Sequence, residues 1–149
     1  MNTNLKANHS SLYETDYLKW IETNLEKLRF QEYDKVDWEN LIEEIEDMAR
    51  SERRSLESNL VVVLLHLLKW QYQPQNRTGS WKGSISEHRR RIRKALKESP
   101  SLKPYFEEIL AECYGDAVQQ ASDETGLTIE AFPDRCLYTT TEILEANLP

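Results

Sequence analysis

Closely spaced carboxylates stand out between residues 39 and 47. Glu43 and Asp47 are four residues apart, and on a helix this spacing places both side chains on one face, next to Glu44. Such carboxylates can chelate a cation or act as an acid and base pair. The chain contains no Glu-x-x-His motif of the kind that di-iron helical bundles use. A solvated acidic face is therefore the plainer interpretation.

His66 lies within the most apolar stretch of the chain, residues 60–68. A helix that is apolar on all sides is buried, so the imidazole of His66 needs a hydrogen-bond partner. A core histidine satisfied in this way is one interpretation. A metal-binding or hydrolytic site that combines His66 with Glu43, Glu44 or Asp47 is the other. No catalytic residue is assigned, and the sequence predicts neither a metal nor a cofactor.

Basic side chains concentrate in residues 82–97, which carry seven basic residues and one acidic residue. The candidate anion-binding set consists of Arg89, Arg90, Arg91, Arg93 and Lys94. Trp70 and Trp81 lie near cations and could stack on a base, although tryptophans at helix ends more often cover a core. The basic segment either contacts a nucleic acid or pairs with acidic helices of its own chain or of a second copy. The net charge of −7 favours pairing, because an acidic protein repels polyanions at long range.

Length and composition limit the class of protein. The chain has 149 residues, enough for one domain, with 39% hydrophobic and 30% charged residues, which is typical of a globular protein rather than a disordered one. Its longest apolar run spans nine residues, whereas a membrane helix needs about 20. The N-terminus lacks the apolar core of a secretory signal, and Cys113 and Cys136 are interpreted as reduced thiols. We therefore expect a cytoplasmic protein with no membrane partner.

Helical spacing of apolar residues extends over nearly the whole chain. Asp16 and Asp37 are favourable N-cap residues, and Thr139 with Glu142 forms a capping-box pattern. No Pro or Gly interrupts residues 37–73, which predicts one long helix or a pair of helices broken near Ser51. The sequence predicts an all-α, single-domain, up-and-down bundle of four to five helices over residues 12–145, with residues 1–11 as a flexible tail.

Several strings of residues also resemble a known family. LYETDYLKW at residues 12–20, DWENLIEEI at 37–45, SERR at 51–54 and HLLKWQYQP at 66–74 are similar to the bacterial, mainly cyanobacterial family called domain of unknown function 29. The resemblance covers about residues 12–145. It implies a small, all-helical cytosolic protein, and it implies no activity, cofactor or catalytic residue.

Taken together, these patterns favour a non-enzymatic helical interaction module. The long second helix has more apolar surface than one neighbouring helix can cover, so we expect it to bind a protein partner or to associate with itself, for example as a homodimer. Nucleic-acid binding through residues 89–94 is the alternative. An enzyme or metal protein that uses His66 is the third hypothesis.

Overall fold

The computed structural model describes residues 12–145, 147 and 148, and the predicted tail at residues 1–11 lies outside them. The described residues contain helices and turns and no strand, so the predicted all-α class is confirmed. The chain divides into two compact units, unit 1 up to Arg50 and unit 2 from Ser51 onward. Each unit is described by itself below.

Five helices have defined bounds: α2 (Tyr17–Arg29), α3 (Trp38–Tyr72), α4 (Gly79–Glu98), α5 (Leu102–Thr125) and α6 (Thr140–Leu144). Single 3-10 turns, η1 (Tyr33–Lys35), η2 (Pro74–Asn76) and η3 (Ile129–Ala131), lie in the connections. Helix α3 continues through Ser51, which decides between the two alternatives for residues 37–73 in favour of one long helix.

A buried polar cluster holds α2 against the start of α3 in unit 1. The carboxylate of Asp37, which is only 4% exposed, accepts hydrogen bonds from Trp20 Nε1 and Asn40 Nδ2, both at 2.8 Å. Its backbone N–H donates to Asn24 Oδ1 at 2.8 Å. Asp37 thereby satisfies polar groups at the beginning of α3 and also ties them to α2, which extends its predicted role as a helix cap.

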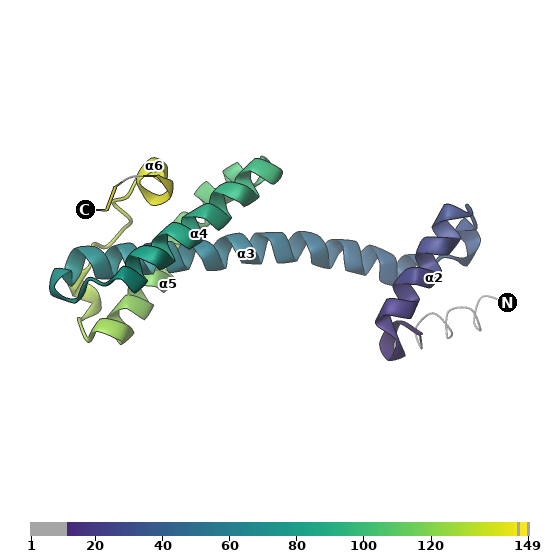
Figure 1. The fold of residues 1–149 in the computed structure, drawn as a ribbon, viewed down its shortest axis with the longest axis horizontal. Coiled ribbons are helices and arrows are strands. Elements are labelled where there is room, and N and C mark those ends of the chain that lie inside the picture. Colours follow the sequence, from purple (N-terminus) through teal and green to yellow (C-terminus); the bar gives the residue numbers. More distant parts are fainter. Residues whose placement is uncertain (1–11, 146, 149) are drawn as a thin grey trace. The chain divides into compact units, whose positions relative to one another are not determined.

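The main hydrophobic core lies in unit 2. Figure 1 shows α4 and α5 crossing the C-terminal half of α3, and α6 lies beside α4. Leu60 and Leu64 of α3 are fully buried, and they belong to one core with Ile92 of α4, Phe106 of α5 and Ile143 of α6. The apolar stretch predicted to be buried therefore is buried.

Local signals place the ends of the helices in unit 2. Helix α5 ends at Gly126, whose φ of 76° is in the left-handed region that glycine adopts without strain. Helix α6 begins with the predicted capping box. Thr139 Oγ1 accepts from the backbone N–H of Glu142 at 3.1 Å, and Glu142 Oε1 accepts from the N–H of Thr139 at 3.2 Å.

Replacing the buried carboxylate tests the role of the polar cluster in unit 1. We expect Asp37→Ala to lower the free energy of unfolding by about 1–3 kcal/mol, because Trp20 Nε1 loses its acceptor and α3 loses its cap. Urea unfolding followed by circular dichroism gives this value, and hydrogen exchange reports opening of α2. The exposed Asp34→Ala is the control. Equal stability of the two variants would contradict the assignment.

Candidate functional site

Helix α3 carries an exposed row of large apolar side chains in unit 1. Trp38, Ile42, Ile45 and Met48 are 44%, 53%, 55% and 60% exposed. Their spacing of four, three and three residues places them along one side of the helix. We call these four residues the apolar row. Isolated exposed apolar residues are ordinary, but a continuous group of them indicates a binding surface.

Further apolar side chains of unit 1 are exposed on α2 and on the connection to α3. They are Tyr17, Leu18, Ile21, Leu25, Phe30 and Tyr33. Leu18, Ile21 and Leu25 follow one another at helical spacing, so α2 presents an apolar stripe of its own. Within residues 12–50, unit 1 thus has two helices that each expose apolar side chains.

A second row, of glutamates, runs beside the apolar row. Each of its members directly follows a residue of the apolar row: Glu39 follows Trp38, Glu43 follows Ile42 and Glu46 follows Ile45. All three glutamates are exposed. We call these three residues the glutamate row. Arg50 lies four residues further along and pairs with Glu46 at 3.7 Å and with Asp47. The predicted acidic face is therefore a solvated surface that borders an apolar one.

The charge of the chain is divided unequally between the units. Residues 12–50 carry 12 acidic and 5 basic side chains, a net charge of −7. Residues 51–149 carry 14 acidic and 13 basic side chains, a net charge of −1. The excess negative charge of the described chain therefore lies almost entirely in the unit that exposes the apolar row.

The predicted polar site of three carboxylates and His66 is divided between the units. Glu43, Glu44 and Asp47 lie in unit 1, whereas His66 lies in unit 2. Glu44 accepts hydrogen bonds from the hydroxyls of Tyr13 and Tyr17, the latter at 2.6 Å. These hydrogen bonds raise the pKa of both tyrosines, so that their hydroxyls stay protonated.

His66 forms its hydrogen bond within its own helix. Its Nδ1 lies 2.8 Å from the carbonyl oxygen of Val62, one turn earlier, and donates to it as Nδ1–H. Burial lowers the pKa of His66 below its ordinary value, which favours the neutral ring. Among the described residues, no group of three His, Cys, Asp or Glu side chains is placed to hold a metal ion.

The five cations predicted to bind an anion have different surroundings. Arg89 Nε donates to the carbonyl of Ile143 at 2.7 Å and its Nη2 to that of Glu142 at 2.8 Å, while Arg93 donates to Leu144 O at 2.7 Å. Arg89 and Arg93 thus satisfy the carbonyls at the end of α6.

The other three cations of α4 face acidic side chains of the same helix. Arg90 and Arg91 both donate to Glu87, at 2.8 and 3.0 Å, and lower its pKa to about 2. Lys94 Nζ lies 3.9 Å from Glu98. Arg90 and Arg91 thus share one carboxylate, and the charges of the three cations are only partly balanced within α4.

Trp70 and Trp81 lie against cations of their own chain. The guanidinium of Arg77 is 4.9 Å from the ring centre of Trp70, and the ammonium of Lys69 is 4.5 Å from that of Trp81. Lys69 also pairs with Glu124 at 3.2 Å. Cation–π contacts of this kind help to fix the end of α3 against the start of α4 and the end of α5.

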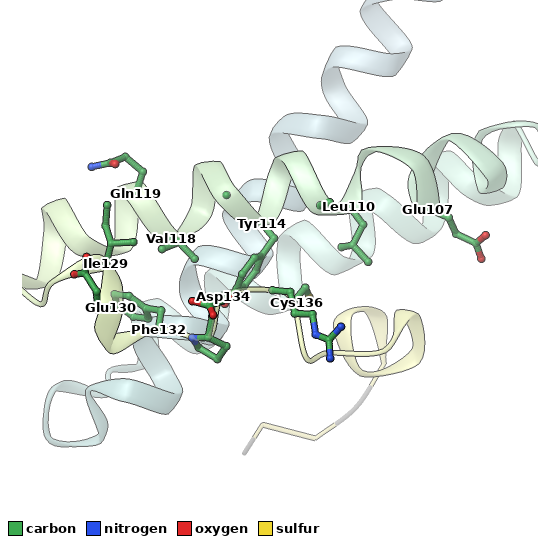
Figure 2. Close-up of a pocket in the computed structure, with 14 residues that line it drawn as sticks. Glu107, Leu110, Tyr114, Val118, Gln119, Ile129, Glu130, Phe132, Asp134 and Cys136 are labelled. Atoms are coloured by element: carbon green, nitrogen blue, oxygen red, sulfur yellow. The ribbon is translucent and has the colours of Figure 1, made fainter.

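Unit 2 contains a groove of about 570 Å³ that the sequence did not predict. Figure 2 shows Tyr114 and Val118 of α5 facing Phe132 and Cys136 of the segment that follows. The hydroxyl of Tyr114 donates to Pro133 O at 2.7 Å, and burial raises the pKa of the Cys136 thiol. The groove is apolar at its base, and its thiol is protonated at neutral pH.

A sequence model of the family described as Domain of unknown function DUF29 matches residues 12–148. The chain belongs to this family. No curated protein and no solved structure matches the chain. The matched range includes residues 12–50 of unit 1 and 51–148 of unit 2, so the acidic apolar surface and the core of unit 2 are parts of the DUF29 domain. Within its described part, no helix is both long enough and apolar enough to cross a bilayer.

The arginines of α4 differ in their expected contribution to stability. Arg89→Ala removes two charged hydrogen bonds to carbonyls of α6, and we expect the free energy of unfolding to fall by about 2–3 kcal/mol. Arg90→Ala on the same helix, which removes a solvent-exposed pair with Glu87, is the control and is expected to leave stability unchanged. Urea unfolding measures both, and an equal loss in the two variants would contradict this role of Arg89.

The lowered pKa of His66 predicts that the stability of the folded chain depends on pH. Because the pKa of His66 is lower in the folded chain than in the unfolded chain, its contribution is complete above an unfolded value of roughly 6.5 and is lost as the pH falls through the folded value. We expect unfolding free energies measured between pH 7.5 and 5 to decline more in the natural chain than in His66→Gln. Parallel profiles for the natural chain and His66→Gln would contradict the assignment.

Proposed function

We propose that this chain is a non-enzymatic interaction module that binds a protein partner through the apolar row of α3 and the apolar stripe of α2. One observation carries the proposal. Of the twelve large apolar side chains exposed among the described residues, ten belong to unit 1. Unit 2 has only Ile129 and Leu137 in this class, so the exposure is concentrated in one part of the chain.

The energetics of burial support a binding role for this surface. Covering apolar surface contributes roughly 25 cal/mol per Å², and aromatic residues often dominate binding energy. Trp38 is 44% exposed, and its Nε1–H is already satisfied by Tyr33 O at 2.7 Å. A partner could therefore cover the ring of Trp38 without leaving this donor unpaired.

Nucleic-acid binding has less support in the surroundings of α4. Arg89 and Arg93 donate to carbonyls of α6, and Arg90 and Arg91 share Glu87. A phosphate would have to compete with these partners. The acidic unit 1 would also repel a nucleic acid.

Catalysis by the predicted residues likewise has less support. Burial raises the pKa of Cys113 to about 11, so this thiol is protonated at neutral pH and a poor nucleophile. Glu44 already accepts two tyrosine hydroxyls, and His66 bonds a carbonyl of its own helix. Glu44 and His66 thus each have hydrogen-bond partners within their own unit.

Native mass spectrometry of protein purified gently from the cells that produce it tests the proposal. We expect an added polypeptide mass that is lost in the double variant Ile42→Asp and Ile45→Asp. Leu137→Asp, which places the same charge at an exposed apolar position of unit 2, should retain the added mass. Circular dichroism confirms that each variant is folded. An added mass that persists in the double variant, or a bare chain throughout, would overturn the proposal.

A further inference from the structure

We infer that the segment received by unit 1 is a basic amphipathic helix of a different protein, with Lys or Arg beside its apolar side chains. This inference rests on the proposed function and names the chemistry of the partner. Three observations support it. The apolar row and the glutamate row run side by side along α3, unit 1 carries a net negative charge, and a second copy of the chain does not offer a complementary surface.

The apolar row has the repeat of a helix-binding surface. It extends from Trp38 to Met48, ten residues along α3, which corresponds to about 15 Å or nearly three turns. A partner helix whose apolar side chains repeat every three or four residues over the same length covers such a row. Spacings of three and four residues on both helices let their side chains interdigitate.

The glutamate row specifies the charge of the partner. Glu39, Glu43 and Glu46 follow the apolar row residue by residue, so a helix lying on that row has one flank against three carboxylates. Glu44, on another side of α3, is held by Tyr13 and Tyr17 and belongs to the packing of unit 1. Lys or Arg on the flanking positions of the partner complements the glutamate row, and the net charge of −7 on residues 12–50 would speed its approach.

A second copy of the chain does not supply this charge through α3. In a two-fold pair the same surface faces itself, and an antiparallel pair centred near Ile45 brings the glutamate row of one copy against that of the other. Arg50 is the single cation of α3 within unit 1, and it already contacts Glu46 and Asp47. Such a pair would therefore concentrate like charges.

The basic helix α4 of a second copy also lacks the required surface. Its apolar side chains Ile85, Ile92 and Leu96 are buried in the core of unit 2. Its exposed Arg90 and Arg91 pair with Glu87. Helix α4 thus offers positive charge without an exposed apolar row, whereas the surface of unit 1 calls for both features on one helix.

Binding of a designed helix to the full chain tests the inference. The probe is a fluorescently labelled 18-residue peptide with Leu at helical a and d positions and Lys or Arg at the flanking positions. One comparison peptide carries Glu at every flanking position. A second has the composition of the probe in scrambled order, which removes its apolar row. Anisotropy titrations give Kd, and size-exclusion chromatography with light scattering gives the oligomeric state of the chain.

We expect the basic peptide to bind a monomeric chain at least tenfold more tightly than either comparison peptide, and more weakly as salt increases. The triple variant Glu39→Gln, Glu43→Gln and Glu46→Gln should raise Kd about tenfold, from the loss of three exposed charge pairs. The control is Glu107→Gln, Glu108→Gln and Glu112→Gln, the same change of charge on exposed positions of α5 in unit 2. It should leave Kd within about twofold.

Other outcomes separate this inference from the proposed function. Equal binding of the basic and acidic peptides, lost in Ile42→Asp with Ile45→Asp, would overturn the basic partner and keep the docking surface. A dimer that dissociates in that double variant would replace the foreign helix with a second copy and again keep the surface. If only the α5 control variant binds the basic peptide more weakly, the binding site lies in unit 2 and both proposals are overturned. Failure of all three peptides to bind a monomeric chain would overturn the inference, and the mass-spectrometry experiment would still decide the proposed function.

Discussion

Helix α3 has to place its apolar side chains in two different surroundings. From Leu56 to Leu68, other helices of unit 2 cover most of its sides, and the leucines and Val63 are buried here. From Trp38 to Met48, the described part of unit 1 provides only α2 and its connections as neighbours. A helix of 13 residues can cover one side of α3, so the other apolar side chains of this part face solvent. The exposed row follows from an uninterrupted helix with too few neighbours at its beginning.

Polar side chains that could have performed chemistry instead hold the helices together. Asp37 joins Trp20 and the backbone of α3, and Arg89 joins α4 to the carbonyls of α6. Buried polar groups are costly unless they are paired, and each of these contacts satisfies groups that helix ends leave without partners. Residue type alone therefore did not reveal these structural roles. The surface of unit 1 exposes apolar side chains beside carboxylates, which is the combination on which the proposed interaction module rests.

Features determined over a few residues were predictable from the sequence. The caps at Asp16 and Thr139 depend on neighbouring residues, and the structure contains both. The sequence left open whether residues 37–73 form one helix or two, and the structure contains one. The hydrogen bonds of Arg89 and Arg93 were less accessible, because they depend on where α6 docks. The groove beside Tyr114 was not predicted. Residues 127–136 lack a periodic pattern, and the single cysteine among them, Cys136, did not by itself indicate a groove. Periodicity revealed the excess of apolar surface on α3, but only tertiary contacts showed which part of it stays exposed.

The unequal charge of the two units connects stability with recognition. Twelve carboxylates and five cations on residues 12–50 repel one another on balance, and this repulsion opposes compact folding of unit 1. The two exposed apolar stripes add surface that water disfavours. A ligand that covers the stripes and supplies positive charge reduces both costs at once, and a ligand that binds only the folded state stabilises it in proportion to ln(1 + [L]/Kd). The exposed apolar and acidic surface lowers the stability of unit 1 by itself, and covering that surface with such a ligand would raise it. This coupling of stability to binding is what the proposed interaction module requires.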